Sequence, residues 1–189
     1  MITSTQARRP ELRLVPGTLD APVKWSWFCG HCAARTPGGE APAPIARVCR
    51  SCGLGLLLEA PEDAVPSNRD AYLVIDSALL VQAMSRRAET LLAVTEELAV
   101  HRPLSDLLVP ADAEAQRPAG FAVAVADAIA GSDGIVQAFV RPWNTFGVRM
   151  RVRIAPCGPP RAVLLVLEAQ RQNLRAVEPE PSSGPAVRG

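Results

Sequence analysis

The sequence predicts an α+β protein in which a small β module is followed by a five-stranded antiparallel sheet with helices on one face. Two Cys-x-x-Cys pairs within residues 25–60 indicate the module. From residue 70 the apolar patterns follow the order strand, strand, several short helices, one longer helix and three strands, a grouping typical of α+β domains. Residues 1–24 and 171–189 mix polar residues with Pro and Gly without a lasting period, which predicts a flexible arm and disordered termini.

Length and charge narrow the class of protein. A chain of 189 residues fits one ordinary domain, or a small and a medium domain together. Its net charge of +1 creates no strong field that would recruit nucleic acid or acidic lipid. No apolar run follows Arg8 and Arg9, and none reaches the roughly 18 residues of a membrane span. We therefore expect a cytoplasmic protein with no membrane partner, where reduced thiols favour metal binding over disulfides.

The four paired cysteines have the spacing of a tetrahedral zinc site. Cys29 and Cys32 form the first pair and Cys49 and Cys52 the second, with about 16 residues between the pairs. Strands are predicted at residues 24–28 and 54–59. A module of this size cannot bury a sufficient core alone, so metal binding has to stabilise it. We predict a zinc ribbon at residues 25–60 with structural Zn²⁺ as its cofactor.

Other chemistry remains open for the same residues. The four sulfurs also suit iron in a rubredoxin-like site. A thioredoxin-type motif needs one pair in a βαβ setting, and neither feature is present. His31 could replace a cysteine, but four thiolates already complete the shell and leave no open position for catalysis. We interpret His31 as a solvent-facing loop residue, and Gly30 and Gly53 as turn residues that reach positive φ.

Residues 61–69 are interpreted as a linker and residues 70–170 as the larger domain. Its predicted elements are strands at 71–75 and 79–84, helical segments at 86–92, 95–98, 103–108 and 121–130, and strands at 135–141, 146–154 and 162–168. Ser85 stands where a helix N-cap belongs. Phe121, Val125 and Ile129 make one apolar stripe on the longest helix.

The last two strands carry different patterns. Residues 146–154 alternate, with Arg149, Arg151 and Arg153 on one face. Together with Arg141 on the strand before, they form an Arg stripe. We interpret it as a solvated face or as salt-bridge partners for a neighbouring subunit, with an anion- or nucleic-acid-binding surface as the alternative. Residues 162–168 are apolar on both faces, as in a central strand that is covered on both sides. Either the leucines at residues 56–58 or a second subunit has to cover the outer face.

The domain resembles the PAS family in three segments. The first is similar to its opening hairpin. The second is similar to its N-x-x-A-x-x-L-L helix, with Ser85 where Asn is common, and the third to its G-x-P-L-x-D-L segment, with His101 in place of Gly. These segments are residues 72–76 with 80–85, residues 86–92, and residues 102–108. The whole chain resembles zinc-ribbon plus PAS-domain proteins of the actinobacterial type.

The resemblance implies a sensor domain that binds a small ligand or dimerises through the outer face of its sheet. Haem-binding relatives carry an axial His on the later helix, and residues 121–130 have none; the Asn-Cys-Arg setting of the light-sensing branch is also absent. We therefore interpret His101 as a turn residue. Cys157 is interpreted as an inert thiol in a turn, with a redox-sensing thiol as the alternative.

These observations favour a cytoplasmic signalling or regulatory protein. We expect the PAS-like domain to sense a ligand or dimerise and the zinc ribbon to dock a protein partner. No nucleophile elbow or phosphate loop is present, so we do not expect an enzyme, and Glu96 and Glu97 are interpreted as solvated. The alternative is a transcription-associated nucleic-acid-binding protein that uses the ribbon and the Arg stripe, although the net charge offers it little support. A third possibility is a redox or metal sensor that uses the cysteines themselves.

Overall fold

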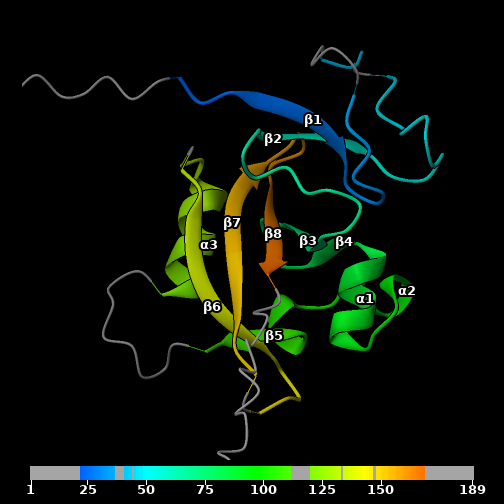
Figure 1. Ribbon diagram of the computed structural model, residues 1–189. Helices are drawn as coiled ribbons and strands as arrows, with labels where there is room; N and C mark the ends of the chain where they lie inside the picture. The colour runs from blue at the N-terminus through cyan, green and yellow to red at the C-terminus, as the bar shows by residue number, and fades with distance from the viewer. Residues whose placement is uncertain are drawn as a thin grey trace, which may run out of the picture.

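The computed structural model describes residues 22–36, 41–43, 45–111, 120–132, 134–146 and 148–168. The predictions for the arm before residue 22 and for the tail after residue 168 lie outside these residues. Within them the chain is a mixture of α and β structure built on a curled antiparallel sheet (Figure 1). No helix in these ranges is long and apolar enough to cross a membrane.

The cysteine module contains two antiparallel strands, β1 (Trp25–Cys29) and β2 (Leu57–Pro61). Trp25 and Trp27 lie two residues apart and share one face of β1. Trp27 is nevertheless buried and Trp25 partly exposed, because burial increases along the strand toward Cys29. Strand β2 begins later than the predicted 54–59, because Leu54 and Gly55 belong to the second cysteine turn. The Leu56–Leu58 run is therefore divided, with Leu56 exposed and Leu58 buried.

The larger sheet has six strands rather than the five predicted, in the order β4-β3-β8-β7-β6-β5. Their bounds are β3 Ala71–Asp76, β4 Val81–Met84, β5 Leu108–Pro110, β6 Val136–Pro142, β7 Met150–Cys157 and β8 Ala162–Glu168. The additional strand β5 pairs with the end of β6 at the edge of the sheet. Strand β8 is central and buried on both faces, which confirms the prediction drawn from its continuous apolar run.

The helices occupy the inner face of this sheet. They are α1 (Arg86–Leu92), α2 (Glu96–Ala99) and α3 (Phe121–Ala130), with a 3₁₀ turn, η2, at Leu104–Asp106. Ser85 caps α1 as predicted: its hydroxyl accepts from the Ala88 N–H and the Tyr72 N–H, and donates to the Asp70 carbonyl. One side chain thus fixes the start of α1 against β3.

The cysteine module covers the outer face of the sheet. Phe28, Leu58 and Ala60 of the module form one buried cluster with residues of β3, β7 and β8, including Tyr72 and Val166. In Figure 1, β1 and β2 lie across one end of β7 and β8. Of the two expected covers, the leucine-bearing segment of the module and a second subunit, the structure uses the module. A second subunit cannot pack on the outer face at these strands without displacing it.

The segment between module and sheet is packed against both. Ala64 and Val65, within the region interpreted as a linker, are buried in the outer cluster. Strand β2 also pairs with the β7–β8 turn, where the backbones of Glu59 and Gly158 exchange two hydrogen bonds. We call this pair the Glu59–Gly158 bridge. Module and sheet are therefore joined by backbone bonding as well as by apolar contact.

Candidate metal centre in the cysteine module

The fold brings the four predicted ligands together. The sulfurs of Cys29, Cys32, Cys49 and Cys52 all lie within 4.8 Å of one another. The Cys29 and Cys52 sulfurs are 3.7 Å apart, and the Cys32 and Cys49 sulfurs are 3.8 Å apart. Both separations exclude a disulfide, whose sulfurs lie about 2.05 Å apart. Four Zn–S bonds of about 2.3 Å in a tetrahedron place the sulfurs about 3.8 Å apart. The geometry therefore fits one metal ion held by four thiolates.

Two backbone turns with the same design place the cysteines. Ala33 N–H donates to the Cys29 carbonyl, and Gly53 N–H donates to the Cys49 carbonyl. The residue after the second cysteine adopts positive φ in each turn, 59° at Ala33 and 69° at Gly53. The prediction of positive φ is thus confirmed at Gly53; in the first turn the position that adopts it is Ala33, and Gly30 instead donates its N–H to the Leu56 carbonyl.

Backbone amides point at two of the sulfurs. The N–H groups of His31 and Cys32 each lie 3.4 Å from the Cys29 sulfur, and the Gly55 N–H lies 3.5 Å from the Cys52 sulfur. Such donors stabilise a thiolate, and the Gly55 N–H lowers the pKa of Cys52 to about 6. Burial has the opposite effect on Cys29 and Cys32 and raises the pKa of both thiols. Metal binding to this set has to displace the remaining thiol protons.

Gly55 allows the two turns to approach each other. A Cβ atom at this position would lie 2.6 Å from the His31 Cβ and closer still to the Cys29 sulfur. Any larger residue therefore collides with the opposite cysteine turn. The cysteine spacing gives no sign of this requirement, because the contact joins the two halves of the module.

Glu96 is, after Gly55, the second residue whose contact with the cysteine module the sequence did not predict. Its Oε2 lies 2.8 Å from Nδ1 of His31, and its Oε1 accepts the Met84 N–H at 2.9 Å. The Glu96 N–H in turn donates to Glu89 at 2.7 Å. The interpretation of Glu96 as solvated is therefore wrong. His31 is held by this carboxylate rather than by the cluster, so the structure places it beside the four sulfurs and not among them.

Tyr72 closes the inner side of the module. Its hydroxyl is buried and has no hydrogen-bond partner among the described residues. Burial, followed by the charges of Cys29 and Cys32, raises its pKa well above the ordinary value, so the phenol stays neutral. The residue belongs to the outer buried cluster and lines a cavity together with Cys32 and Cys52.

The other predicted site residues lie away from this cluster. Cys157 ends β7 and is buried, so it is a strand residue rather than the expected turn residue, and burial raises its pKa to about 12. His101 lies in a turn with φ of 64°, exposed, as expected. Neither residue belongs to a cluster of three or more metal-binding side chains within the described ranges.

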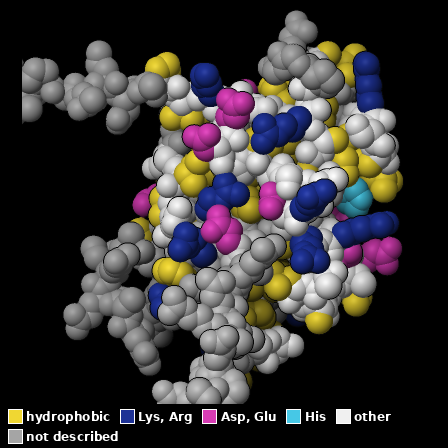
Figure 2. Space-filling view, in the orientation of Figure 1, with side chains coloured by type: hydrophobic (Ala, Val, Ile, Leu, Met, Phe, Trp, Pro, Cys, Tyr) yellow, Lys and Arg dark blue, Asp and Glu magenta, His cyan; other side chains and the backbone are white. Residues whose placement is uncertain are grey.

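The Arg stripe is engaged within the molecule. Arg153 donates to the Asp63 carbonyl and pairs with Glu168 at 2.9 Å, while Arg149 stacks on the Phe139 ring at 3.8 Å. Arg141 binds three backbone carbonyls between residues 142 and 145. Figure 2 shows positive and negative side chains interspersed over this view, with no continuous basic surface. These arginines therefore have partners within their own chain, rather than the expected salt bridges to a neighbouring subunit.

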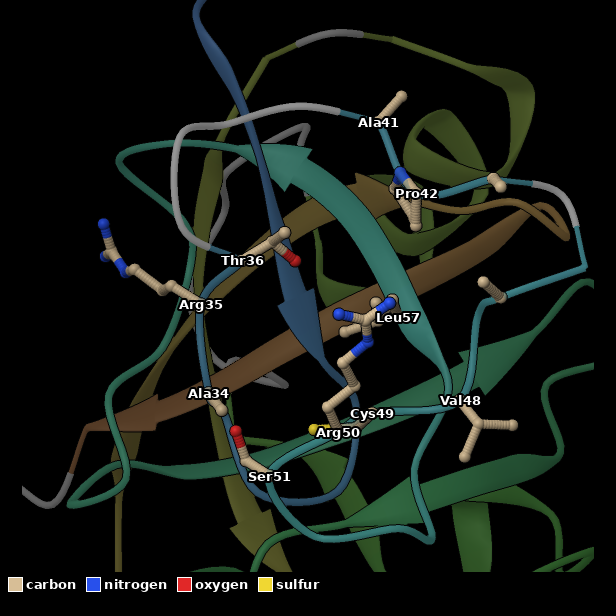
Figure 3. Close-up of a pocket in the computed structure, with 12 residues that line it drawn as sticks. Ala34, Arg35, Thr36, Ala41, Pro42, Val48, Cys49, Arg50, Ser51 and Leu57 are labelled. Carbon is tan, nitrogen blue, oxygen red and sulfur yellow. The ribbon is translucent and has the colours of Figure 1, made fainter.

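The module also has an open side. A cavity of about 310 Å³ is lined by residues of both cysteine turns and of the connection between them, among them Thr36, Arg50 and Leu57. Figure 3 shows the Arg50 side chain extending toward Leu57, whereas Arg35 points away from the cavity. The module therefore packs one side on the sheet and presents the other outward.

Comparison with known proteins adds a limited likeness. No family model matches the chain, and no curated protein matches it. Among solved structures, the chain is similar to a chain of the crystal structure of the E. coli DhaR(N)-DhaL complex, with 17% identity and a TM-score of 0.39. The match covers 53% of this chain and 31% of that chain. At this TM-score the likeness assigns neither a fold family nor a function to the present chain.

Proposed function

We propose that the chain is a regulatory protein that acts by binding, with a zinc ribbon as its docking module and a PAS-like domain as its sensor. The observation that carries the zinc assignment is the spacing of the four sulfurs, 3.7 and 3.8 Å across two pairs. Cys29, Cys32, Cys49 and Cys52 would hold the ion. Four thiolates leave no position for a substrate, so the ion would supply folding stability and no catalytic step.

The docking role is supported by what the module leaves exposed. Ile45, Val48, Leu54 and Leu56 are large apolar side chains with half or more of their surface in solvent. Exposed apolar side chains grouped on one small module are typical of a protein-binding surface. The outer face of the sheet at β8 is already covered, so a partner would bind the module itself.

The sensor role is supported by an apolar cavity on the helix side of the sheet. It measures about 470 Å³ and is lined by apolar residues of η2, β5 and α3, including Leu104, Leu108, Phe121 and Val125. Sites of about 300–1,000 Å³ with few polar groups hold small molecules. The matching ligand is a small apolar molecule.

Native mass spectrometry tests both parts of this proposal. The expected result is one zinc ion per native chain and no zinc in either the Cys29→Ser or the Cys49→Ser variant. Any small apolar ligand should stay bound to each chain until the chain is denatured. Iron in place of zinc, or a full zinc load in either variant, contradicts the metal assignment. A ligand that stays bound equally well when Val125→Trp fills the cavity contradicts the sensor assignment.

A further inference from the structure

A groove lies where the cysteine module meets the edge of the sheet. It encloses about 880 Å³ between the module on one side and β3, β4, α2 and the β7–β8 turn on the other. We call it the junction groove. Leu58 and Val74 are buried at its base, and Leu54 and Leu56 form its wall with 75% and 51% of their surfaces exposed. Nothing among the described residues covers these two leucines.

The contacts around the groove hold its shape. His31 and Glu96, which are 2.8 Å apart, tie the first cysteine turn to the start of α2. The Gly30 N–H bonds to the Leu56 carbonyl and fixes the leucine-bearing segment to the same turn. The opening therefore exists before anything binds, which lowers the ordering cost for an occupant.

The charge of the groove is negative on balance. Asp76 and Glu97 line it and form no ion pair with any described residue. The Asp76 carboxylate accepts only neutral donors, the N–H groups of Ala78 and Leu80 and the Gln82 amide. Arg161 is the one cation of the lining that opposes them. The complementary occupant is an extended segment that alternates arginine with large apolar side chains.

The chain carries such a segment before β1. Residues 7–15 read Ala-Arg-Arg-Pro-Glu-Leu-Arg-Leu-Val, with three arginines against one glutamate and with Leu12, Leu14 and Val15 as apolar side chains. We infer that residues 7–15 dock in the junction groove of their own chain, with the arginines at Asp76 and Glu97 and the leucines against Leu54 and Leu56.

The tether is long enough for this contact. Residues 22–31 join the described N-terminal end to the groove and can span at most about 32 Å, at about 3.6 Å per residue. Residues 7–13 lie 9 to 15 residues before Pro22 and can reach about 32–54 Å, whereas Leu14 and Val15 can reach about 25–29 Å. A short tether gives an effective concentration in the millimolar range, so a weak contact suffices for occupancy. The inference goes beyond the proposed function, because it gives the chain an internal competitor for a surface of its docking module.

Limited trypsin digestion of the full-length, metal-loaded chain tests the inference. The readout is the initial rate of cleavage at the Arg13–Leu14 bond, followed by mass spectrometry. Docking protects this bond, so the Glu97→Arg variant should be cut about threefold faster or more, and about 0.5 M salt should speed cleavage of the native chain because it screens the ion pairs. Glu62→Arg, an exposed acid outside the groove lining, is the matched control and should leave the rate unchanged. Equal rates in all three chains overturn the inference.

A labelled peptide of residues 5–17 provides the second measurement. It should bind a full-length variant with Arg8, Arg9 and Arg13 changed to Glu at least about tenfold more tightly than it binds the native chain, whose own arm competes. Equal binding to the two chains overturns the inference. A dimer mass for the native chain that the arm variant loses also overturns it, because the arm would then occupy the groove of a second copy. Zinc content is measured in every sample, so a failure of the metal assignment is distinguished from a failure of docking.

Discussion

The replacement Gly55→Ala tests the geometry of the metal centre most directly. The added methyl group would lie 2.6 Å from the His31 Cβ and nearer to the Cys29 sulfur, where unstrained carbon contacts need about 3.5–4.0 Å. One cysteine turn has to move by about 1 Å, and such overpacking costs about 1–3 kcal/mol. Because this cost arises in the folded, metal-bound module, the apparent metal affinity should fall by about 5- to 150-fold.

A competition titration against a chromophoric zinc chelator measures this change. Gly120→Ala is the matched control, since a Cβ there meets nothing within 4 Å and its φ of −73° suits any residue. The control should keep both the native affinity and the native melting temperature. If Gly55→Ala binds zinc as tightly as the control does, the close approach of the two cysteine turns is not required and the assignment of the four-sulfur site is refuted.

Three further changes test the cover of the sheet, the buried thiol and the ligand set. Val166→Asp places a carboxylate at a site that is 2% exposed and should lower the free energy of unfolding, measured by chemical denaturation, by about 3 kcal/mol or more. The control Val148→Asp, at 42% exposure, should lower it little. Equal losses in the two variants would contradict the packing of the module on β8. Cys157, with a pKa of about 12, should resist iodoacetamide at pH 8 until the chain unfolds; rapid labelling of the native chain would show that the thiol is accessible. Because the thiol of the unfolded chain ionises near pH 9, the contribution of Cys157 to stability should be lost as pH rises from about 9 to 12. The Cys157→Ala variant should lose less stability over the same pH range. His31→Ala should lower stability by about 0–1 kcal/mol and keep one metal ion per chain, since His31 makes a partly exposed side-chain contact with Glu96 and not a ligand bond. Loss of the metal would make His31 a ligand.

The sequence predicts those elements whose signal is local. The Ser85 cap and the longest helix depend on neighbouring residues, and the helix bounds match the structure at residues 121–130. Strand β8 is recognisable because its apolar run reflects burial on both faces. Strand β5 was missed because three residues ending in Pro110 carry no alternation, and their pairing with β6 is a tertiary contact.

The candidate site divides in the same way. Cysteine spacing is a local pattern, so the four ligands could be named from it. The contact between His31 and Glu96 joins residues far apart in the chain, and the need for glycine at position 55 arises only when the two cysteine turns meet. Neither leaves a local mark. Strand β7 likewise extends to Cys157 because that residue pairs with Ala162 across the turn.

The Glu59–Gly158 bridge has a consequence for how the chain would lose its structure. Two backbone bonds connect β2 to the turn between β7 and β8, the central strands of the sheet. A module attached only through a flexible linker could melt by itself and leave the sheet intact. Here the amide hydrogens of Glu59 and Gly158 should exchange with solvent at one common rate, and that rate should rise when a chelator removes the metal. Loss of the ion would then destabilise the central strands of the sheet, so the cysteine cluster would make the module and the sheet unfold together.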